Sequence, residues 1–262
     1  MNSTEITELA IKRHDIDAHH FQSAYNNKAN DKHTQIFLYG RNLVLDELKN
    51  VLKDLKPGAK VLDVGCGTAH LTNWIKQQGF DVTGVEPSEE MLKLAKENFP
   101  EIKIVNSIAS ALPFEDDQFD LVVSFEVLRY LDKAENIKSY REFYRVLKPG
   151  GRFFITQVNQ YSTDLYYFFH HAKSIYCKLR NQVHHFCNFT TSGKEISLLK
   201  QIGYSKVTTV GRLAGTIRMP YKISAGLGKA YSRFIELFDK KQRYTGPFSK
   251  NTAGHLIVIA EK

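Results

Sequence analysis

Five short apolar runs alternate with helical stretches between residues 60 and 158. Each run is mostly apolar throughout and is bounded by turn residues, which is typical of strands that are covered on both faces. The runs comprise residues 60–65, 80–86, 102–107, 119–125 and 151–158. Because strands that alternate with helices in this order build parallel sheets, the sequence predicts a doubly wound α/β fold.

The stretches between the runs carry helix start and stop signals. Ser88 is a residue type that favours the N-cap, and Glu89 and Glu90 would place negative charge in the first helical turn. Residues 133–147 keep helical spacing until the sequence KPGG at 148–151 ends it. Both signals support alternation of strand and helix.

Beyond residue 158 the alternation loosens. Residues 192–203 and 204–211 predict one more helix and strand, and residues 255–262 predict a terminal strand. Two insertions interrupt them, at 159–190 and at 212–250.

The chain shows no internal repeat, low-complexity tract or linker. We therefore interpret residues 1–262 as a single domain. Residues 1–55 predict helices that precede the sheet and form a lid, and the two insertions predict a cap.

The cysteine content predicts a reducing compartment. Three cysteines are too few for a disulfide framework. The first residues lack the basic flank and apolar run of a signal peptide, and no run approaches the length of a membrane span. These features together predict a cytoplasmic protein without disulfides.

The net charge of +8 is unevenly distributed, because the excess of Lys and Arg lies wholly beyond residue 156. Residues 218–244 place apolar and basic side chains on different sides of a helix, which fits either peripheral membrane contact or packing as a cap. A nucleic-acid substrate is disfavoured. The fourth run ends in SFEVL at residues 124–128, where an Asn/Asp-Pro-Pro-aromatic loop able to grip a flipped base is absent.

A glycine turn follows the first apolar run in VLDVGCGTAH. Glycines at the carboxyl end of a first strand allow a tight turn and a close approach of backbone to ligand. Glu86 closes the second run, at the distance where a carboxylate can accept both hydroxyls of a ribose. Together they predict a nucleoside ligand.

Charge selects among nucleoside ligands. Asp63 lies two residues before Gly65, where a carboxylate would repel the pyrophosphate of a dinucleotide. S-adenosylmethionine carries an ammonium and a sulfonium instead, and Asp63 can complement that cationic end. The sequence therefore favours S-adenosylmethionine as the cofactor.

Four blocks resemble the class I S-adenosylmethionine-dependent methyltransferases, particularly the group that acts on small molecules. They are VLDVGCGTAH, VTGVEPSEEMLKLAK, SALPFEDDQFDLVVSFEVLRYL and REFYRVLKPGGRFFI, in family order and spacing. The resemblance covers roughly residues 40–156 and implies a Rossmann-like sheet of seven strands, mostly parallel, with the last strand antiparallel. The chain departs from many relatives at Ala69, where they have a third glycine, and at Ile108, where they have an aspartate.

The resemblance also implies roles for individual residues. The glycine turn would hold the methionine end, Glu86 the ribose, the following residues the adenine, and the end of the fourth strand the amino group. The methionine end would contact Asp63, Gly65, Cys66 and Gly67, and the ribose would contact Glu86. The adenine would contact Pro87, Met91, Ile108 and Ala109, and the amino group would contact Phe125. Arg41 could reach the cofactor carboxylate as a forked donor.

The acceptor side is less constrained by the sequence. The family pattern places Glu126, Arg129 and Tyr130 near the acceptor, and the lid would turn Tyr25 toward the reaction centre. A histidine from the first insertion, His171, is our candidate for a base, since imidazole titrates near neutrality. Residues 170–187 also hold His and Cys side chains, but without a compact Cys-x-x-Cys pair we predict no metal site.

The sequence therefore predicts an S-adenosylmethionine-dependent methyltransferase that acts on a small aromatic, acidic or lipid-like molecule. Two alternatives remain open at this point. One is a non-catalytic member of the same fold that binds the cofactor or a partner. The other is a nicotinamide-dependent oxidoreductase, which the charge of Asp63 disfavours.

Overall fold

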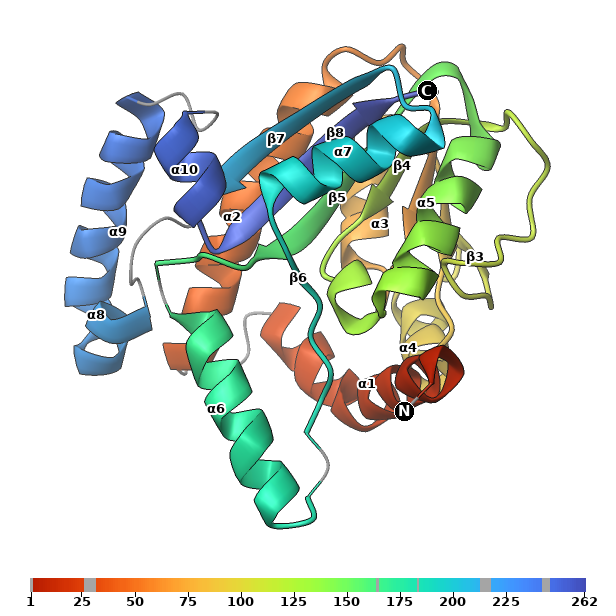
Figure 1. Ribbon diagram of the computed structural model, residues 1–262. Helices are drawn as coiled ribbons and strands as arrows, with labels where there is room; N and C mark the ends of the chain where they lie inside the picture. The colour runs from red at the N-terminus through yellow and green to blue at the C-terminus, as the bar shows by residue number, and fades with distance from the viewer. Residues whose placement is uncertain (1, 26–31, 164, 183, 213–217, 242–245) are drawn as a thin grey trace.

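The structure is a computed structural model that describes residues 2–25, 32–163, 165–182, 184–212, 218–241 and 246–262. One mixed sheet runs through it in the order β3-β2-β1-β4-β5-β8-β7 (Figure 1). Its strands are β1 (Lys60–Val64), β2 (Asp81–Val85), β3 (Lys103–Val105), β4 (Phe119–Ser124), β5 (Leu147–Asn159), β7 (Lys206–Arg212) and β8 (His255–Glu261). This arrangement confirms the predicted doubly wound α/β class.

The terminal strand β8 lies antiparallel between β5 and β7, as expected. The count of strands differs from the prediction, because the described residues form a sheet of eight strands rather than seven. The additional strand is β6 (Phe189–Thr190), which pairs in parallel with the last two residues of β5. Two residues are too short a run for hydrophobic periodicity to reveal.

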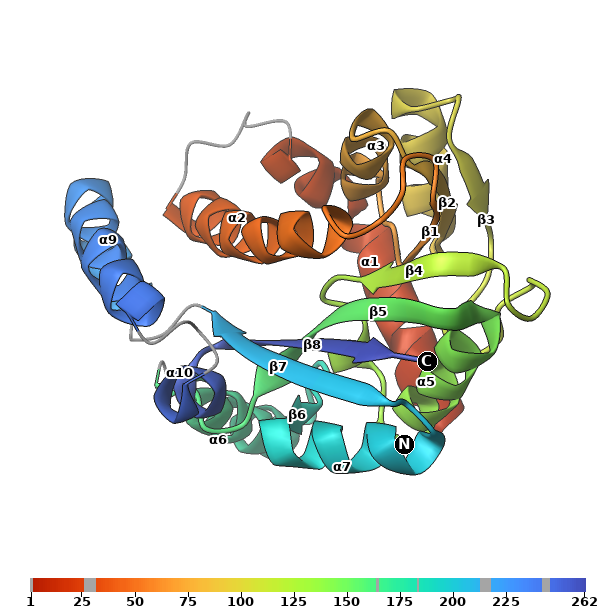
Figure 2. The same ribbon diagram turned by 90° about the horizontal axis from the view of Figure 1, so that it is seen from above.

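Helices cover both faces of the sheet (Figure 2). On one face, α2 (Lys32–Leu52) and α3 (His70–Gln77) contribute Leu48 and Ile75 to a core with Phe154 of β5. On the other, α5 (Lys133–Val146) and α7 (Ser192–Ile202) contribute Phe143 and Leu199 to a second core. Burial on both faces explains why the strand sequences are almost continuously apolar.

The helix α1 (Ser3–Tyr25) is fixed to the start of α4 (Glu89–Asn98). Ser88 caps α4 as predicted, accepting from the Met91 backbone N–H at 3.2 Å. The same hydroxyl donates to Asp15 Oδ1 of α1 at 2.5 Å, and Phe21 of α1 packs with Met91 and its neighbours. α1 is therefore held across the carboxyl ends of the neighbouring strands (Figure 1).

The remaining helices are α6 (Tyr166–Leu179), α8 (Arg218–Ile223), α9 (Ala225–Lys241) and α10 (Pro247–Thr252), with a 3₁₀ turn at Leu128–Tyr130. They fall within the two predicted insertions and within the segment that follows β4. α6 extends away from the sheet (Figure 1). No helix among the described residues is long and apolar enough to cross a membrane.

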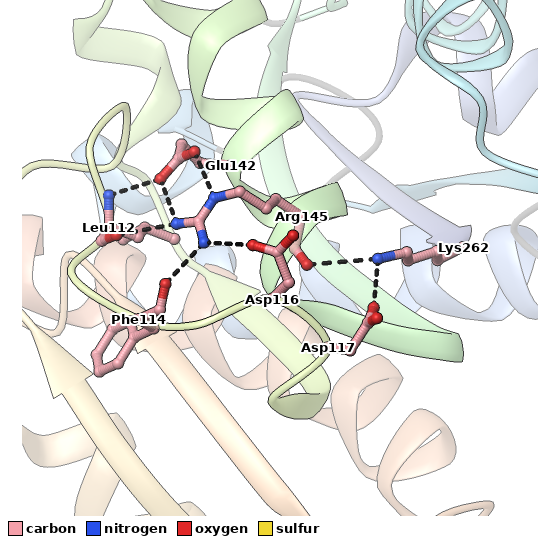
Figure 3. A network of polar contacts seen from close by, with 7 residues as sticks. All are labelled: Leu112, Phe114, Asp116, Asp117, Glu142, Arg145 and Lys262. Atoms are coloured by element: carbon pink, nitrogen blue, oxygen red, sulfur yellow. Dashed lines mark hydrogen bonds and ion pairs between the residues drawn. The ribbon is translucent and has the colours of Figure 1, made fainter.

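Arg145 of α5 binds the loop that precedes β4 (Figure 3). Its guanidinium donates to the carbonyls of Phe114 and Leu112, at 2.7 and 3.0 Å, and to the carboxylates of Glu142 and Asp116, each within 2.9 Å. The Arg145 side chain therefore supplies hydrogen-bond donors to two carbonyls of this loop.

Replacing Arg145 by Met is expected to lower the free energy of unfolding by about 1–3 kcal/mol, because both loop carbonyls and Glu142 lose a charged donor. Denaturant unfolding measures this effect. Lys206→Met is the matched control: Lys206 pairs with Glu261 on an exposed surface, and its loss should cost about 0.5 kcal/mol or less. Equal losses in the two variants would contradict a structural role for the Arg145 contacts.

Candidate functional site

A cavity of about 540 Å³ lies at the carboxyl ends of β1, β2 and β4, beneath α1. Residues from the glycine turn and from the end of β2 line one part of it. Residues 125–127, residues 129–131 and His255 line another. The volume falls within the range of small-molecule sites, and open α/β sheets bind their ligands at this edge.

The glycine turn needs glycine for two reasons. Gly65 has φ +74°, and a Cβ placed on it would lie 2.1 Å from Val127 Cγ2. The N–H groups of Gly65 and Cys66 both donate to the Val85 carbonyl, at 2.7 and 3.0 Å, which fixes the turn against β2. The backbone can therefore border the cavity closely.

Glu86 is buried where β2 ends, and its carboxylate is aligned by backbone donors. Gly67 N–H donates to Oε2 at 2.8 Å, and Ser88 N–H donates to Oε1 at 3.0 Å. Burial is the largest influence on this carboxyl and raises its pKa to about 7, against the lowering effect of these two hydrogen bonds. Glu86 lines the cavity, so a ribose could meet it there.

The raised pKa of Glu86 predicts a pH-dependent stability of the free protein. Between its usual value of 4.5 and about 7, the folded state holds a proton that the unfolded state has released. Its contribution to stability therefore falls as pH rises through this window. Relative to Glu86→Gln, the wild type should lose about 2–3 kcal/mol of unfolding free energy between pH 4.5 and 7.5.

Denaturant unfolding of both proteins at several pH values tests this prediction, because titrations common to both cancel in the difference. A difference that stays constant, or that grows in favour of the wild type with rising pH, would contradict it.

Asp63 lies behind the turn and does not line the cavity. Its carboxylate accepts from Thr72 Oγ1 at 2.7 Å, and burial raises its pKa to about 7. The direct contact between Asp63 and the cofactor stays a prediction, because Asp63 is not among the residues that line the cavity. The aspartate instead connects β1 to α3 beneath the turn.

The other residues that we predicted for the cofactor all line the cavity. They are Gly65, Cys66, Gly67, Pro87, Met91, Ile108, Ala109, Phe125 and Arg41. Arg41 does so from α2, where its guanidinium lies 4.8 Å from the centre of the Tyr25 ring. Tyr25 in turn stacks on His70, with ring centres 4.8 Å apart. Tyr25, which we predicted as a lid residue, also lines the cavity.

A charged cluster lies where β4 ends. Glu126 adopts a left-handed conformation with φ 59°, and its backbone N–H donates to Thr156 Oγ1 at 2.7 Å. Its carboxylate accepts from Arg129 Nη1 at 2.6 Å. Burial would raise the pKa of Glu126, but His255 and Arg129 together lower it below its usual range. Glu126 is therefore ionised at neutral pH.

His255, at the start of β8, is a titratable cavity residue that the sequence analysis missed, and His14 of α1 is another. Its Nδ1 lies 3.1 Å from Glu126 Oε1. The two atoms are within ion-pair distance, although their geometry does not make a hydrogen bond. The residue stands 129 positions after Glu126, and only the antiparallel placement of β8 brings them together.

The predicted acceptor-side residues have different outcomes. Tyr130 lines the cavity, with its ring edge against His14 of α1 at 4.8 Å. His171 does not line it: the side chain is exposed on α6, and its Nδ1 contacts the Tyr167 carbonyl at 2.8 Å. The structure therefore corrects the placement of His171, because α6 turns that face outward.

Comparison with known proteins agrees with this geometry. Residues 62–155 match a family model described as a methyltransferase domain. A demethylmenaquinone methyltransferase of Lysinibacillus sphaericus is 30% identical over 189 residues, which cover 66% of this chain and 76% of the relative. The chain belongs to the class I S-adenosylmethionine-dependent methyltransferases. An uncharacterized methyltransferase of Synechocystis sp. is 35% identical over 113 residues. The match covers 43% of this chain and 53% of that relative, so this chain spans about half of the relative's length.

Solved structures share the fold of this methyltransferase. A TehB-like S-adenosylmethionine-dependent methyltransferase from Corynebacterium glutamicum has a TM-score of 0.58 and 17% identity, over 96% of this chain and 99% of that one. Phosphoethanolamine N-methyltransferase 2 of Haemonchus contortus, in complex with S-adenosylhomocysteine, also has a TM-score of 0.58. It is 18% identical, over 83% of this chain and 52% of its own.

The cofactor of this family fits the residues present. The glycine turn and the buried carboxylate of Glu86 border the pocket, and Asp63 lies behind the turn. Carboxylates at this edge of the sheet suit a cationic sulfonium better than a phosphate. This agreement supports the predicted cofactor, S-adenosylmethionine.

Proposed function

We propose that this chain transfers a methyl group from S-adenosylmethionine to an apolar aromatic acceptor that carries an ionisable hydroxyl group. Bound S-adenosylmethionine supplies an electrophilic methyl group on its sulfonium. The observation that carries the proposal is the Glu126–His255 pair, which borders the same cavity as the glycine turn. A base beside the acceptor is needed when the nucleophile must lose a proton.

The pair has the arrangement of an oriented general base. Glu126 lies on the Nδ1 side of His255, and in this proposal Nε2 takes the hydroxyl proton. The hydroxyl proton would move to Nε2 as a ring carbon activated by that hydroxyl bonds to the methyl group and the sulfur–methyl bond breaks, which leaves S-adenosylhomocysteine. Transfer of the proton from that carbon back to the oxygen then restores the aromatic ring and the hydroxyl. The imidazolium that forms is stabilised by the Glu126 carboxylate and later releases its proton to water.

The apolar walls support an aromatic rather than a charged acceptor. Ile11, Val127 and Leu131 line the cavity near the pair, and Tyr130 adds an aromatic wall. Arg129 also lines it, but its charge is matched by Glu126 and its Nη2 donates to Tyr166 at 2.9 Å. Demethylmenaquinone, for which the relative from Lysinibacillus sphaericus is named, belongs to the quinone class that yields such hydroxyls on reduction.

The distribution of exposed apolar side chains supports a membrane source for the acceptor. Among the described residues, the large apolar side chains that are strongly exposed lie on α1, on α8 and α9, and within residues 161–179. Phe168, Phe169 and Leu179 are at least 60% exposed on or beside α6, close to exposed Lys173 and Arg180. Apolar and basic groups together suit an anionic bilayer surface.

A methylation assay tests the acceptor class. The protein is incubated with methyl-labelled S-adenosylmethionine and, in separate reactions, with a 1,4-naphthohydroquinone that lacks a ring methyl, with catechol and with phosphoethanolamine. We expect label in the solvent-extracted naphthohydroquinone. Label found only in phosphoethanolamine, or in no acceptor although the cofactor binds, would contradict the proposal.

Vesicle sedimentation tests the membrane contact. We expect binding to vesicles of mixed phosphatidylglycerol and phosphatidylcholine, and weaker binding to phosphatidylcholine alone. The double variant Phe168→Ser/Phe169→Ser should lower binding at least fivefold, since two exposed rings are removed. Lys206→Gln, which changes an exposed charge on β7, should leave binding unchanged. Equal binding by both variants would contradict a contact through α6.

A further inference from the structure

Three histidines from two segments meet outside the main cavity. His170 lies on α6, and His184 and His185 lie in the irregular segment before β6. One ring nitrogen of each lies within 4.8 Å of those of the other two. The ring centres are 4.5 Å apart for His170 and His184, 5.1 Å for His170 and His185, and 4.5 Å for His184 and His185.

Protein hydrogen bonds account for only part of this cluster, because His184 bonds to the backbone of His170 but does so through one ring nitrogen. Nε2 of His184 is buried and has no hydrogen-bond partner among the described residues. A buried polar atom without a partner is costly, so it points to a ligand that would complete it. Ring packing alone would not require imidazole, because phenyl rings such as that of Phe189 already pack against His170.

The spacing is close to that of a coordination site. Nitrogens on a tetrahedral zinc ion lie about 3.3 Å apart, since each Zn–N bond is about 2.0–2.1 Å long. The observed 4.8 Å limit requires the rings to approach by about 1.5 Å at most. Side-chain rotation can supply this on the irregular segment that carries His184 and His185.

We propose that His170, His184 and His185 bind one divalent transition-metal ion of the zinc class. Three imidazoles without a carboxylate favour zinc, cobalt, nickel or copper over magnesium and calcium. Three protein ligands leave a fourth position for water or an anion.

The surrounding charges favour an anion there. Arg13, Arg129 and Lys173 face the cluster, and the first two are already paired with Asp17 and Glu126.

A metal ion at this site would stabilise the part of the main cavity that Tyr130 lines. A smaller cavity of about 200 Å³ separates α1 from residues 184–186, and His184 and His185 line it together with Tyr130. Tyr130 also lines the main cavity. Asn188 N–H further donates to the Arg129 carbonyl at 2.7 Å. Metal binding would therefore fix the segment before β6 against the turn that carries Arg129 and Tyr130.

Metal titration of the whole chain, after removal of any affinity tag and treatment with a chelator, tests the proposal. Competition with a chromophoric zinc indicator should give one zinc per chain with an apparent Kd below about 10 µM. Cobalt should give the visible absorption of a tetrahedral site. Zinc should also raise the thermal midpoint, because it binds only the folded cluster.

Variants show which residues hold the ion. His184→Ala and His185→Asn should each weaken zinc binding at least tenfold and abolish the thermal shift. His171→Ala is the matched control, since His171 is exposed beside His170 and should leave binding unchanged. Circular dichroism verifies that each variant is folded. If His184→Ala is unfolded, His185→Asn still tests the site, because it keeps a polar side chain. Zinc binding weaker than about 100 µM, or equal binding by the cluster variants and His171→Ala, would overturn the proposal.

Discussion

His255→Asn is expected to lower kcat by about 100-fold or more with the naphthohydroquinone acceptor, while cofactor affinity stays within about twofold. General base catalysis contributes roughly 10²–10⁴-fold to rates, and Asn cannot take the proton. The Glu126 carboxylate remains paired with Arg129 in the variant, so the pocket keeps a charge partner. Single-turnover kinetics measure the chemical step directly.

The pH–rate profile distinguishes a base from a structural residue. The wild type should show a pH-dependent limb in the rate of the chemical step that His255→Asn lacks. His14 of α1 is the rival base, because it also lines the cavity. If His14→Asn abolished the limb while His255→Asn preserved it, the assignment of the base to His255 would be wrong.

Gly65→Ala is expected to weaken S-adenosylhomocysteine binding at least 100-fold and to lower the free energy of unfolding by about 2–4 kcal/mol. The new methyl group would lie 2.1 Å from Val127 Cγ2, and φ is +74°. Relief of this collision must displace either the turn or residues 125–131, and both border the cavity. Calorimetric titration and denaturant unfolding measure the two effects.

Gly58→Ala separates the collision from the backbone conformation. Gly58 has φ +75°, as Gly65 does, but its Cβ would meet nothing within 4 Å. It should cost about 1 kcal/mol in stability and leave cofactor affinity unchanged. Gly65→Ala/Val127→Ala should recover part of the binding that Gly65→Ala loses. Cofactor affinity at the wild-type level in Gly65→Ala alone would show that the turn does not shape the site.

The cofactor half of the cavity could be predicted because its residues are close in sequence. The turn at Gly65 follows a strand that is apolar enough to recognise, and Glu86 ends the next strand. Parallel strands bring their carboxyl ends to one edge, so two local signals predicted a joint site. The N-cap at Ser88 was predicted for the same local reason.

The acceptor half could not be predicted in this way. His255 and Glu126 meet only because β8 inserts antiparallel beside β5. No local pattern distinguishes His255 from the other histidines, and His171 was chosen instead. The cluster of His170, His184 and His185 likewise depends on how the segment before β6 returns along α6, and the sequence signal of paired histidines did not reveal that geometry.

Asp63 shows a different limit. Its charge and position correctly favoured a cationic nucleoside, but its side chain points to Thr72 rather than to the cavity. A sequence pattern places a residue at a strand end. Only the packing of α3 on β1 decides which way the carboxylate turns.

A crystal structure with S-adenosylhomocysteine tests the central claim most directly, namely that one cavity holds the cofactor at the glycine turn and leaves the acceptor side to His255. We predict ribose hydroxyls about 3 Å from the Glu86 carboxylate, adenine beside Ile108 and Ala109, and the sulfur on the side of the cavity that faces Glu126 and His255. Density for the ligand outside this cavity, or a ribose that makes no contact with Glu86, would contradict the account.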